Sequence, residues 1–373
     1  MTNHYSRQAF DEDDFRAVLE ALKSDFITQG ERVDCFEKEI ANYVGAAYAV
    51  VFNSATSALN IAYKILGEKG DSFLTTPISF CATSNMMLEN NIEPIFCDIN
   101  HLGNINLDSI IKNLDSNESR KIKAIVSVDY AGNSVEALKI KEICKKFNLY
   151  FISDSAHSFG GEYNGIKIGG FADITIFSFH ALKPITTIEG GAIVTNNFDF
   201  YTKAKLLRSH GMVKNTPWDG ELSCLGHNFR LSDVASALGI SQLKKLPSFL
   251  EKRAKVAKIY NDNFKNNNYF TFFNIPSNIK STHHLYPIFL HERFFESKPK
   301  ILQALLDSNI GVQVHYKPIY QFNLYKNYKP VENMENVDNF YNAEISLPLH
   351  QLLSIEDINY ISTRLFEILK KFI

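Results

Sequence analysis

Short apolar runs alternate with amphipathic segments of helical periodicity from about residue 47 onward. YAVVF at 48–52 is followed by SATSALNIAYKIL at 54–66, and KAIVSV at 123–128 is followed by SVEALKIKEICKKF at 134–147. Strands that helices cover on both faces have continuous apolar sequences, and parallel strands need such crossovers. The alternation therefore predicts an α/β fold with a mostly parallel sheet and helices on both of its faces.

The chain has 373 residues, more than one hydrophobic core usually serves, so a second, smaller unit is expected. A helix is predicted over 230–246, and the proline at 247 predicts the start of another. We expect a large domain over 1–245 and a small C-terminal domain over 246–373. The small domain is predicted to contain strands at 283–290 and 311–316, and helices at 298–309 and 355–372.

The composition is that of an ordinary globular protein, with 21% charged residues and a net charge of −2, so no nucleic-acid partner is expected. The N-terminal stretch has no apolar core of the signal-peptide type, and no run is long enough to span a membrane. A cytoplasmic protein with no membrane partner is expected. The five cysteines are scattered, which predicts buried or half-buried free thiols rather than disulfides or a zinc site.

Polar residues that directly follow apolar strands are the candidates for function, because ligands of parallel sheets bind at the carboxyl ends of the strands. The first group is NSATSAL, where backbone N–H groups near Ala55 and the hydroxyl of Thr56 can hold an anion. An ordinary helix cap at Ser54 is the alternative. No glycine-rich nucleotide-binding motif accompanies it, which counts against dinucleotide and P-loop readings.

Asp154 ends a strongly apolar strand, and His157 follows it closely. Such an acid can cap a helix, bind magnesium or hold a protonated ring nitrogen, and the histidine can orient it or contact the same ligand. Lys183 lies in FSFHALKPITTIEGG, an unusually apolar setting that can depress the pKa of its amine.

Thr56, Asp154 and Lys183 together match the needs of pyridoxal 5'-phosphate, which requires an anion cradle, a carboxylate for the ring nitrogen and a lysine for the aldehyde. Phe80 can add an aromatic face against the ring, with core packing as its alternative. No metal site is expected, since His283 and His284 are adjacent on a predicted strand and point to opposite faces.

The segments NSATSAL, TTPISFCAT, SDSAHSFGG, FSFHALKPITTIEGG and GHNFRLSDVASALGISQL occur in this order. They resemble the DegT/DnrJ/EryC1/StrS family of pyridoxal phosphate dependent sugar aminotransferases over nearly the whole chain. The resemblance implies the type I fold of such transferases, with a seven-stranded, mostly parallel sheet in the large domain and a smaller C-terminal α+β domain. Relatives that dehydrate their substrates carry histidine where this chain has Lys183, which favours transamination.

The resemblance also implies roles for individual residues. Lys183 would form the Schiff base, Asp154 would pair with the pyridine nitrogen and His157 would lie beside the ring. Cofactor contacts are implied for Ala55, Thr56, Phe80, Asp154, His157, Ser178, Lys183 and Asn228, of which Asn228 would reach the cofactor of a neighbouring subunit, making a homodimer with active sites at the interface. Substrate contacts are implied for Tyr5, Ile27, Thr28, Gln29, Gly30, His315, Tyr316, Lys317 and Pro318.

Within the family, segments such as SDFITQGERV and VHYKPIYQFNLY are most similar to members that aminate C4 of a UDP-linked 4-keto-6-deoxy-N-acetylhexosamine in pseudaminic acid biosynthesis. The expected amino donor is L-glutamate, with ping-pong kinetics. Amination at C3, or at C4 of another hexose, is the nearest alternative, and a non-catalytic regulatory protein is a more distant one. The polar stretch at 211–226 is either a cover over the partner's site or a surface loop.

Overall fold

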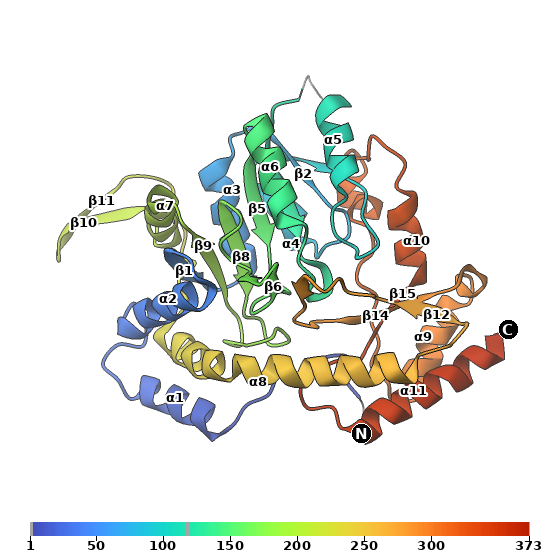
Figure 1. The fold of residues 1–373 in the computed structure, drawn as a ribbon. Coiled ribbons are helices and arrows are strands. Elements are labelled where there is room, and N and C mark those ends of the chain that lie inside the picture. Colours follow the sequence, from blue (N-terminus) through green and yellow to red (C-terminus); the bar gives the residue numbers. More distant parts are fainter. Residues whose placement is uncertain (1–2, 117–119, 373) are drawn as a thin grey trace.

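The computed structural model describes residues 3–116 and 120–372. Its centre is a seven-stranded sheet in the order β1-β9-β8-β5-β4-β2-β3 (Figure 1). Only β9 runs antiparallel to its neighbours, so the predicted mostly parallel sheet is confirmed. The strands are β1 (Tyr48–Phe52), β2 (Ser72–Thr75), β3 (Glu93–Phe96), β4 (Ile122–Val128), β5 (Tyr150–Asp154), β8 (Ile174–Ser178) and β9 (Gly191–Thr195).

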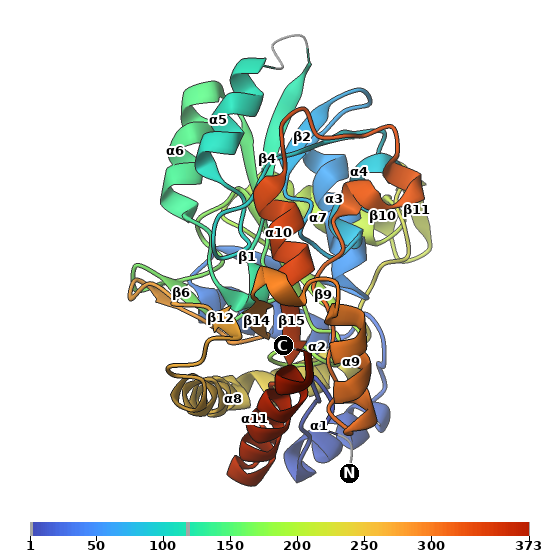
Figure 2. The same ribbon diagram turned by 90° about the vertical axis from the view of Figure 1, so that its right-hand side faces the viewer.

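Helices cover both faces of this sheet (Figures 1 and 2). Side chains alternate along each strand, so Val50 and Phe52 of β1 pack in one core while Ala49 and Val51 pack in the core on the opposite face. The helices of this part are α2 (Glu31–Val44), α3 (Ala55–Leu66), α4 (Ala82–Glu89), α5 (Leu107–Ser116), α6 (Ala137–Phe147), α7 (Phe198–Arg208) and α8 (Asp233–Asn263).

A second core lies in the C-terminal part, between a three-stranded antiparallel sheet and three helices (Figure 2). The sheet has the order β12-β14-β15, and the end of α8 packs with α9 and α11 against it. These elements are β12 (Phe270–Phe272), β14 (Tyr286–Leu290), β15 (Glu344–Leu347), α9 (Lys298–Asp307) and α11 (Ile355–Leu369). Helix α10 (Glu335–Ala343) packs in a separate core with Tyr130 and Ile319. The other elements are α1 (Glu12–Leu22), β6 (Glu162–Tyr163), β7 (Ile166–Lys167), β10 (Met212–Thr216), β11 (Asp219–Leu222), β13 (Ile279–Lys280) and five short 3-10 helices, η1 (Tyr130–Gly132), η2 (Glu292–Phe294), η3 (Ile319–Gln321), η4 (Asn323–Tyr325) and η5 (Lys370–Phe372).

Helix α8 is continuous across Pro247, so the expectation of two separate helices is wrong. A proline inside a helix costs about 3 kcal/mol because one hydrogen bond is lost. Leu246 and Phe249, on either side of Pro247, are buried in the core of the large sheet, and burial of such side chains stabilises by about 1.5–3 kcal/mol each. The division into 1–245 and 246–373, which stays a prediction, places its boundary inside this helix.

The sequence pattern predicts a strand at 311–316, and this prediction is wrong. It forms only an isolated bridge, from Gln313 to Ser346. The backbone N–H of His315 donates instead to the carboxylate of Glu344, at 2.7 Å, which removes it from a strand ladder.

The cysteines are free thiols, but Cys35 and Cys224 are exposed, contrary to the expectation that all five would be buried or half-buried. Cys35 lies on the solvent side of α2 and Cys224 lies in the segment after β11. Across residues 3–116 and 120–372, no helix is both long and apolar enough to cross a membrane.

Candidate active site

A cavity of about 440 Å³ lies at the carboxyl ends of the parallel strands. It is formed by segments from the ends of β1, β2, β4, β5 and β8 together with the N-terminal segment and the loop before η3. Ten of the residues expected to contact cofactor or substrate line it: Tyr5, Ala55, Thr56, Phe80, Asp154, His157, Ser178, Lys183, His315 and Tyr316.

The N-terminus of α3 forms one wall of the cavity. Ser54 caps this helix by accepting the N–H of Ser57, at 3.1 Å. The first N–H groups of a helix have no acceptor within it and carry partial positive charge, so they bind anions. Gly191 of β9 packs directly behind them, since a Cβ there would lie 2.4 Å from the backbone nitrogen of Ala55. The helix cap at Ser54 is therefore confirmed, while the anion cradle stays a prediction; Ala55, Thr56 and Ser178 line the same cavity.

Lys183 reaches the cavity from the loop after β8, where its N–H donates to the carbonyl of His180 at 2.9 Å. Removal from water lowers the pKa of its amine to about 8, and the charge of Arg253 adds to this, while Asp154 acts in the opposite direction. An amine with such a pKa is partly neutral at physiological pH and can act as a nucleophile.

Asp154 ends β5 and is buried. Its carboxylate accepts the hydroxyl of Thr83 at 2.7 Å and the N–H of Ala156 at 3.2 Å. Burial raises the pKa of this carboxyl, whereas the two hydrogen bonds and the charge of Lys183 lower it. A buried carboxylate in a cavity favours a cationic ligand group, such as a protonated ring nitrogen.

His157 is buried beside Asp154 and its Nε2 lies 3.1 Å from the hydroxyl of Tyr316. Its ring is 4.2 Å from that of His284, a cavity residue that the sequence reasoning considered only as a metal ligand. Burial, and then the charge of Lys183, holds the pKa of His157 well below its usual value, so its imidazole is neutral.

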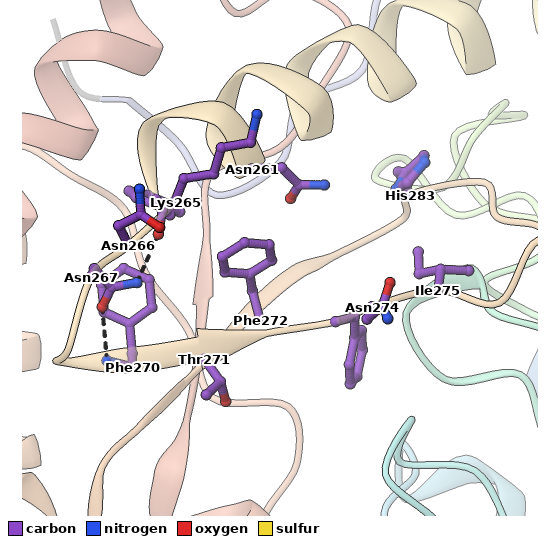
Figure 3. A pocket seen from close by; sticks show the side chains of 12 residues that line it. Asn261, Lys265, Asn266, Asn267, Phe270, Thr271, Phe272, Asn274, Ile275 and His283 are labelled. Carbon is purple, nitrogen blue, oxygen red and sulfur yellow. Dashed lines mark hydrogen bonds between the residues drawn. The ribbon is translucent and has the colours of Figure 1, made fainter.

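His283 lies elsewhere, although it directly precedes His284. Figure 3 shows His283 at the margin of a surface groove lined by residues such as Lys265 and Phe272 of the C-terminal part. His283 therefore lines the surface groove, whereas His284 lines the cavity that contains Lys183. In the described part of the chain, no three histidine, cysteine or acidic residues gather in a way that could hold a metal ion.

Phe80 is 60% exposed, so it is not a core residue, and its ring contacts Tyr316 edge-on at 6.3 Å between centroids. Tyr5 enters from the N-terminal segment and lies 5.6 Å from the ring of His315. The cavity therefore has several aromatic side chains in its lining, which suits a flat ring or a sugar.

Several expected site residues do not line this cavity. Asn228 is exposed and pairs with Ser209 through an isolated bridge. Ile27, Thr28 and Gln29 are exposed as well, and Gly30, which caps α2, donates its N–H to Asp233 at 2.7 Å. Lys317 is exposed, with its amine 5.0 Å from the ring centre of Phe322, and Pro318 is buried before η3.

The sequence reasoning missed other cavity residues: His180, Leu182, Glu189 and His284. It also missed Thr83, which holds Asp154. His180, Leu182 and Glu189 lie within the quoted stretch around Lys183, so that motif was the available signal for them. Nothing in the sequence pairs Thr83 with Asp154, because they lie 71 positions apart.

The hairpin of β10 and β11 projects away from the sheet (Figure 1). Trp218 at its turn is 86% exposed, and Met212 and Leu222 are exposed too. Exposed apolar side chains on a projecting hairpin are unusual for a surface that contacts only water.

Comparisons with known proteins agree on one family. The family model for DegT/DnrJ/EryC1/StrS aminotransferases matches residues 8–366. The UDP-4-amino-4,6-dideoxy-N-acetyl-beta-L-altrosamine transaminase of Campylobacter jejuni serotype O:23/36 is 47% identical over 98% of this chain and 97% of its own. The protein of that name from Helicobacter pylori is 46% identical, over 99% of this chain and 98% of its own.

Solved structures give the same result. Helicobacter pylori PseC, an aminotransferase involved in the biosynthesis of pseudaminic acid, matches with a TM-score of 0.95 and 45% identity over all of both chains. A putative sugar aminotransferase from Streptococcus pneumoniae, Spr1654, matches in its PLP-form with a TM-score of 0.92 and 27% identity over all of both chains. The chain therefore belongs to the DegT/DnrJ/EryC1/StrS aminotransferase family, has the type I fold of pyridoxal phosphate dependent transferases, and uses that cofactor.

Proposed function

We propose that this protein transfers an amino group from L-glutamate to C4 of a UDP-linked 4-keto-6-deoxy-N-acetylhexosamine in pseudaminic acid biosynthesis. The observation that carries the proposal is the meeting of three groups at one sheet edge: the N-terminus of α3, the buried carboxylate of Asp154 and the amine of Lys183. The relatives with 46–47% identity, matched over nearly their full lengths, support the choice of sugar.

The residues present fit pyridoxal phosphate. The N–H groups of Ala55 and Thr56, with the hydroxyl of Ser178, would hold its phosphate, and Gly191 keeps the backbone close enough for that cradle. Asp154 would hold its ring nitrogen protonated, and Phe80 and His157 would lie beside its ring. When bound, the cofactor supplies an aldehyde that carries the amino group and a ring that withdraws electrons.

The protein's own groups bind, orient and move protons. The amine of Lys183, with its pKa of about 8, would be the neutral nucleophile that holds the aldehyde group of the cofactor, and its Nζ would take up and release protons in the site. The hydrogen bond from Thr83 keeps Asp154 ionised and oriented. His157, neutral and close to Tyr316, would orient the ring without adding charge.

A homodimer completes the proposed site. Asn228, which does not line the cavity of its own chain, would reach the cofactor phosphate of the second copy, and the β10–β11 hairpin with Trp218 would pack against that copy. The exposed segment from Ile27 to Gly30 would then face the sugar from the neighbouring chain, while Tyr5 and the segment from His315 to Pro318 would face it from within. A cytoplasmic location is part of the proposal, supported by the free cysteines.

A substrate panel tests the proposal. Purified protein with pyridoxal phosphate is incubated with L-glutamate and UDP- or dTDP-linked 3-keto and 4-keto sugars, and 2-oxoglutarate is followed. Turnover should be fastest with the UDP-linked 4-keto-6-deoxy-N-acetylhexosamine and absent in Lys183→Ala. Turnover with only a 3-keto sugar would contradict the C4 assignment. Cofactor binding without turnover on any sugar would favour a regulatory protein instead.

A further inference from the structure

His315 is held at three of its four hydrogen-bonding atoms. Its backbone N–H donates to Oε2 of Glu344 at 2.7 Å, and its carbonyl accepts the hydroxyl of Tyr130 at 2.7 Å. Its ring nitrogen Nδ1 lies 2.8 Å from the hydroxyl oxygen of Ser346. Only Nε2 has no hydrogen-bond partner among residues 3–116 and 120–372, and the His315 side chain lines the cavity that contains Lys183.

The contact of Ser346 with Glu344 fixes the direction of this chain of hydrogen bonds. Ser346 donates its single hydroxyl hydrogen to Oε1 of Glu344, at 2.5 Å. An ionised carboxylate can only accept, so the hydroxyl oxygen must accept from His315, and Nδ1 therefore carries the hydrogen. In a neutral imidazole the other nitrogen, Nε2, is then an acceptor.

The surroundings keep the imidazole neutral, and the carboxylate of Glu344 is ionised above its pKa of about 7. Burial, and then the charge of Lys183, lowers the pKa of His315 to about 3. Burial raises the pKa of Glu344 to about 7, against the hydrogen bonds from Ser346 and His315 and the charge of Lys298 on α9. His157 and His284 are close enough to interact with His315, and burial keeps both neutral by lowering their pKa values. Tyr316 and Tyr5 contact the ring of His315, and both stay protonated because burial raises their pKa values.

We propose that Glu344, acting through Ser346, is a positioning residue that fixes His315 with Nε2 as a hydrogen-bond acceptor for the sugar. The matching group on the substrate is a donor, either a ring hydroxyl or the N–H of an acetamido group. A site that presents a buried acceptor rejects sugars that lack the donor, because the acceptor is then left unpaired. The proposal rests on the proposed function for the identity of the sugar, but the hydrogen position on His315 does not depend on it.

Glu344→Gln should reverse the direction of the hydrogen bonds from Glu344 through Ser346 to His315, while the side chain keeps its size. The amide of the new side chain would donate to the hydroxyl of Ser346, which would then donate to Nδ1 of His315, so the hydrogen would move to Nε2. Ser346→Ala removes the hydroxyl that links Glu344 to His315. Ser346→Thr, which keeps the hydroxyl, is the matched control.

The direct test is a long-range proton–nitrogen spectrum of protein labelled with ¹⁵N-histidine, recorded above the Glu344 pKa of about 7. The His315 signals are assigned by their loss in His315→Gln. We expect the hydrogen on Nδ1 in the wild type and in Ser346→Thr, and on Nε2 in Glu344→Gln. A wild-type hydrogen on Nε2 would overturn the proposal, whatever the sugar proves to be.

The kinetic test separates substrate recognition from a general loss of structure. In Ser346→Ala and Glu344→Gln, the KM for the sugar that the substrate panel selects should rise about tenfold or more. The half-reaction with glutamate should keep its rate within about twofold, since glutamate lacks the sugar donor. Ser346→Thr should restore the wild-type KM. An unchanged KM in Ser346→Ala, or equal losses in both half-reactions, would show that Glu344 does not act through His315 on the sugar.

Discussion

Thr83 donates its hydroxyl hydrogen to Oδ2 of Asp154 across 2.7 Å, and both residues are buried. This bond joins the start of α4 to the end of β5, so the helix after one strand orients the acid at the end of another. The N–H of Ala156 holds the other carboxylate oxygen at 3.2 Å. Asp154 is thus fixed before any cofactor arrives.

Removing the hydroxyl of Thr83 should weaken cofactor binding. Thr83→Val keeps the shape of the side chain but leaves Oδ2 of Asp154 unpaired, which raises the pKa of that carboxyl further. A hydrogen bond to a charged group is worth about 1.5–3 kcal/mol, so the Kd for pyridoxal phosphate should rise about 10-fold to 100-fold. Titration of the apo-protein with pyridoxal phosphate, followed by absorbance, measures this Kd. Thr83→Ser, which keeps the hydroxyl, should bind the cofactor nearly as tightly as the wild type does. Equal Kd values for Thr83→Val and wild type would contradict this role.

Gly191→Ala should damage the phosphate cradle. A Cβ at this position would lie 2.4 Å from the backbone nitrogen of Ala55, so α3 would have to shift. We expect at least a tenfold loss of affinity for pyridoxal phosphate, about 1.4 kcal/mol or more. Gly170→Ala is the matched control, because its Cβ would meet nothing closer than 4.0 Å. The prediction fails if both variants bind the cofactor equally well.

Capture of the cofactor should depend on pH through Lys183. The folded-state pKa of about 8 lies below the ordinary lysine pKa of 10.5, and only the neutral amine attacks the aldehyde. The capture rate should therefore rise about tenfold per pH unit below that pKa and level off above it. Rapid-mixing absorbance measures this rate, with Lys183→Arg as the inactive control. A midpoint near 10.5 would contradict the lowered pKa.

The same shift predicts how the stability of the apo-protein changes with pH. Between pH 8 and 10.5 the folded state binds fewer protons at Lys183 than the unfolded state. The contribution of this residue to the free energy of unfolding therefore increases with pH across that window. Lys183→Met should remove that part of the slope in denaturant titrations at several pH values. If the slope is the same in both proteins, Lys183 is not the group responsible.

Asp233 should control the position of the segment from Ile27 to Gly30. Its buried carboxylate accepts the N–H of Gly30 at 2.7 Å and that of Arg32 at 3.0 Å, at the start of α2. Asp233→Ala should lower the free energy of unfolding by about 1–3 kcal/mol and raise the KM for the sugar. Asp34→Ala, an exposed acid on α2, should change neither by a comparable amount. A normal KM in Asp233→Ala would show that the segment does not face the sugar.

Shared active sites predict complementation between two inactive variants. Lys183→Ala and Asn228→Ala should each have little activity alone. In co-expressed mixtures, half of the dimers would be mixed, and each mixed dimer would contain one site with both wild-type residues. Activity should recover to about one quarter of the wild-type value. No recovery, with mixed dimers demonstrated by tagged purification, would place Asn228 outside the partner's site.

The sequence predicted much of the fold because its strands are buried on both faces. Their continuous apolar runs located β1 and β8 closely, and the polar residues after them located Thr56 and Lys183. The prediction failed where tertiary contacts override local preference, as at Pro247, whose helix is supported by two cores, and at His315, whose backbone bonds a side chain. It could not find Thr83 or Glu344, since neither belongs to a local pattern and both act through residues distant in sequence.

Helix α8 has 31 residues, and its first half packs in the core of the large sheet while Val256, Ala257 and Tyr260 pack in the C-terminal core. At 1.5 Å per residue it is about 46 Å long and carries no break. Unfolding of either core would expose about half of the buried face of α8. Loss of one core should therefore lower the stability of the other. We therefore expect the two parts of the chain to unfold together, so that heat produces a single unfolding transition.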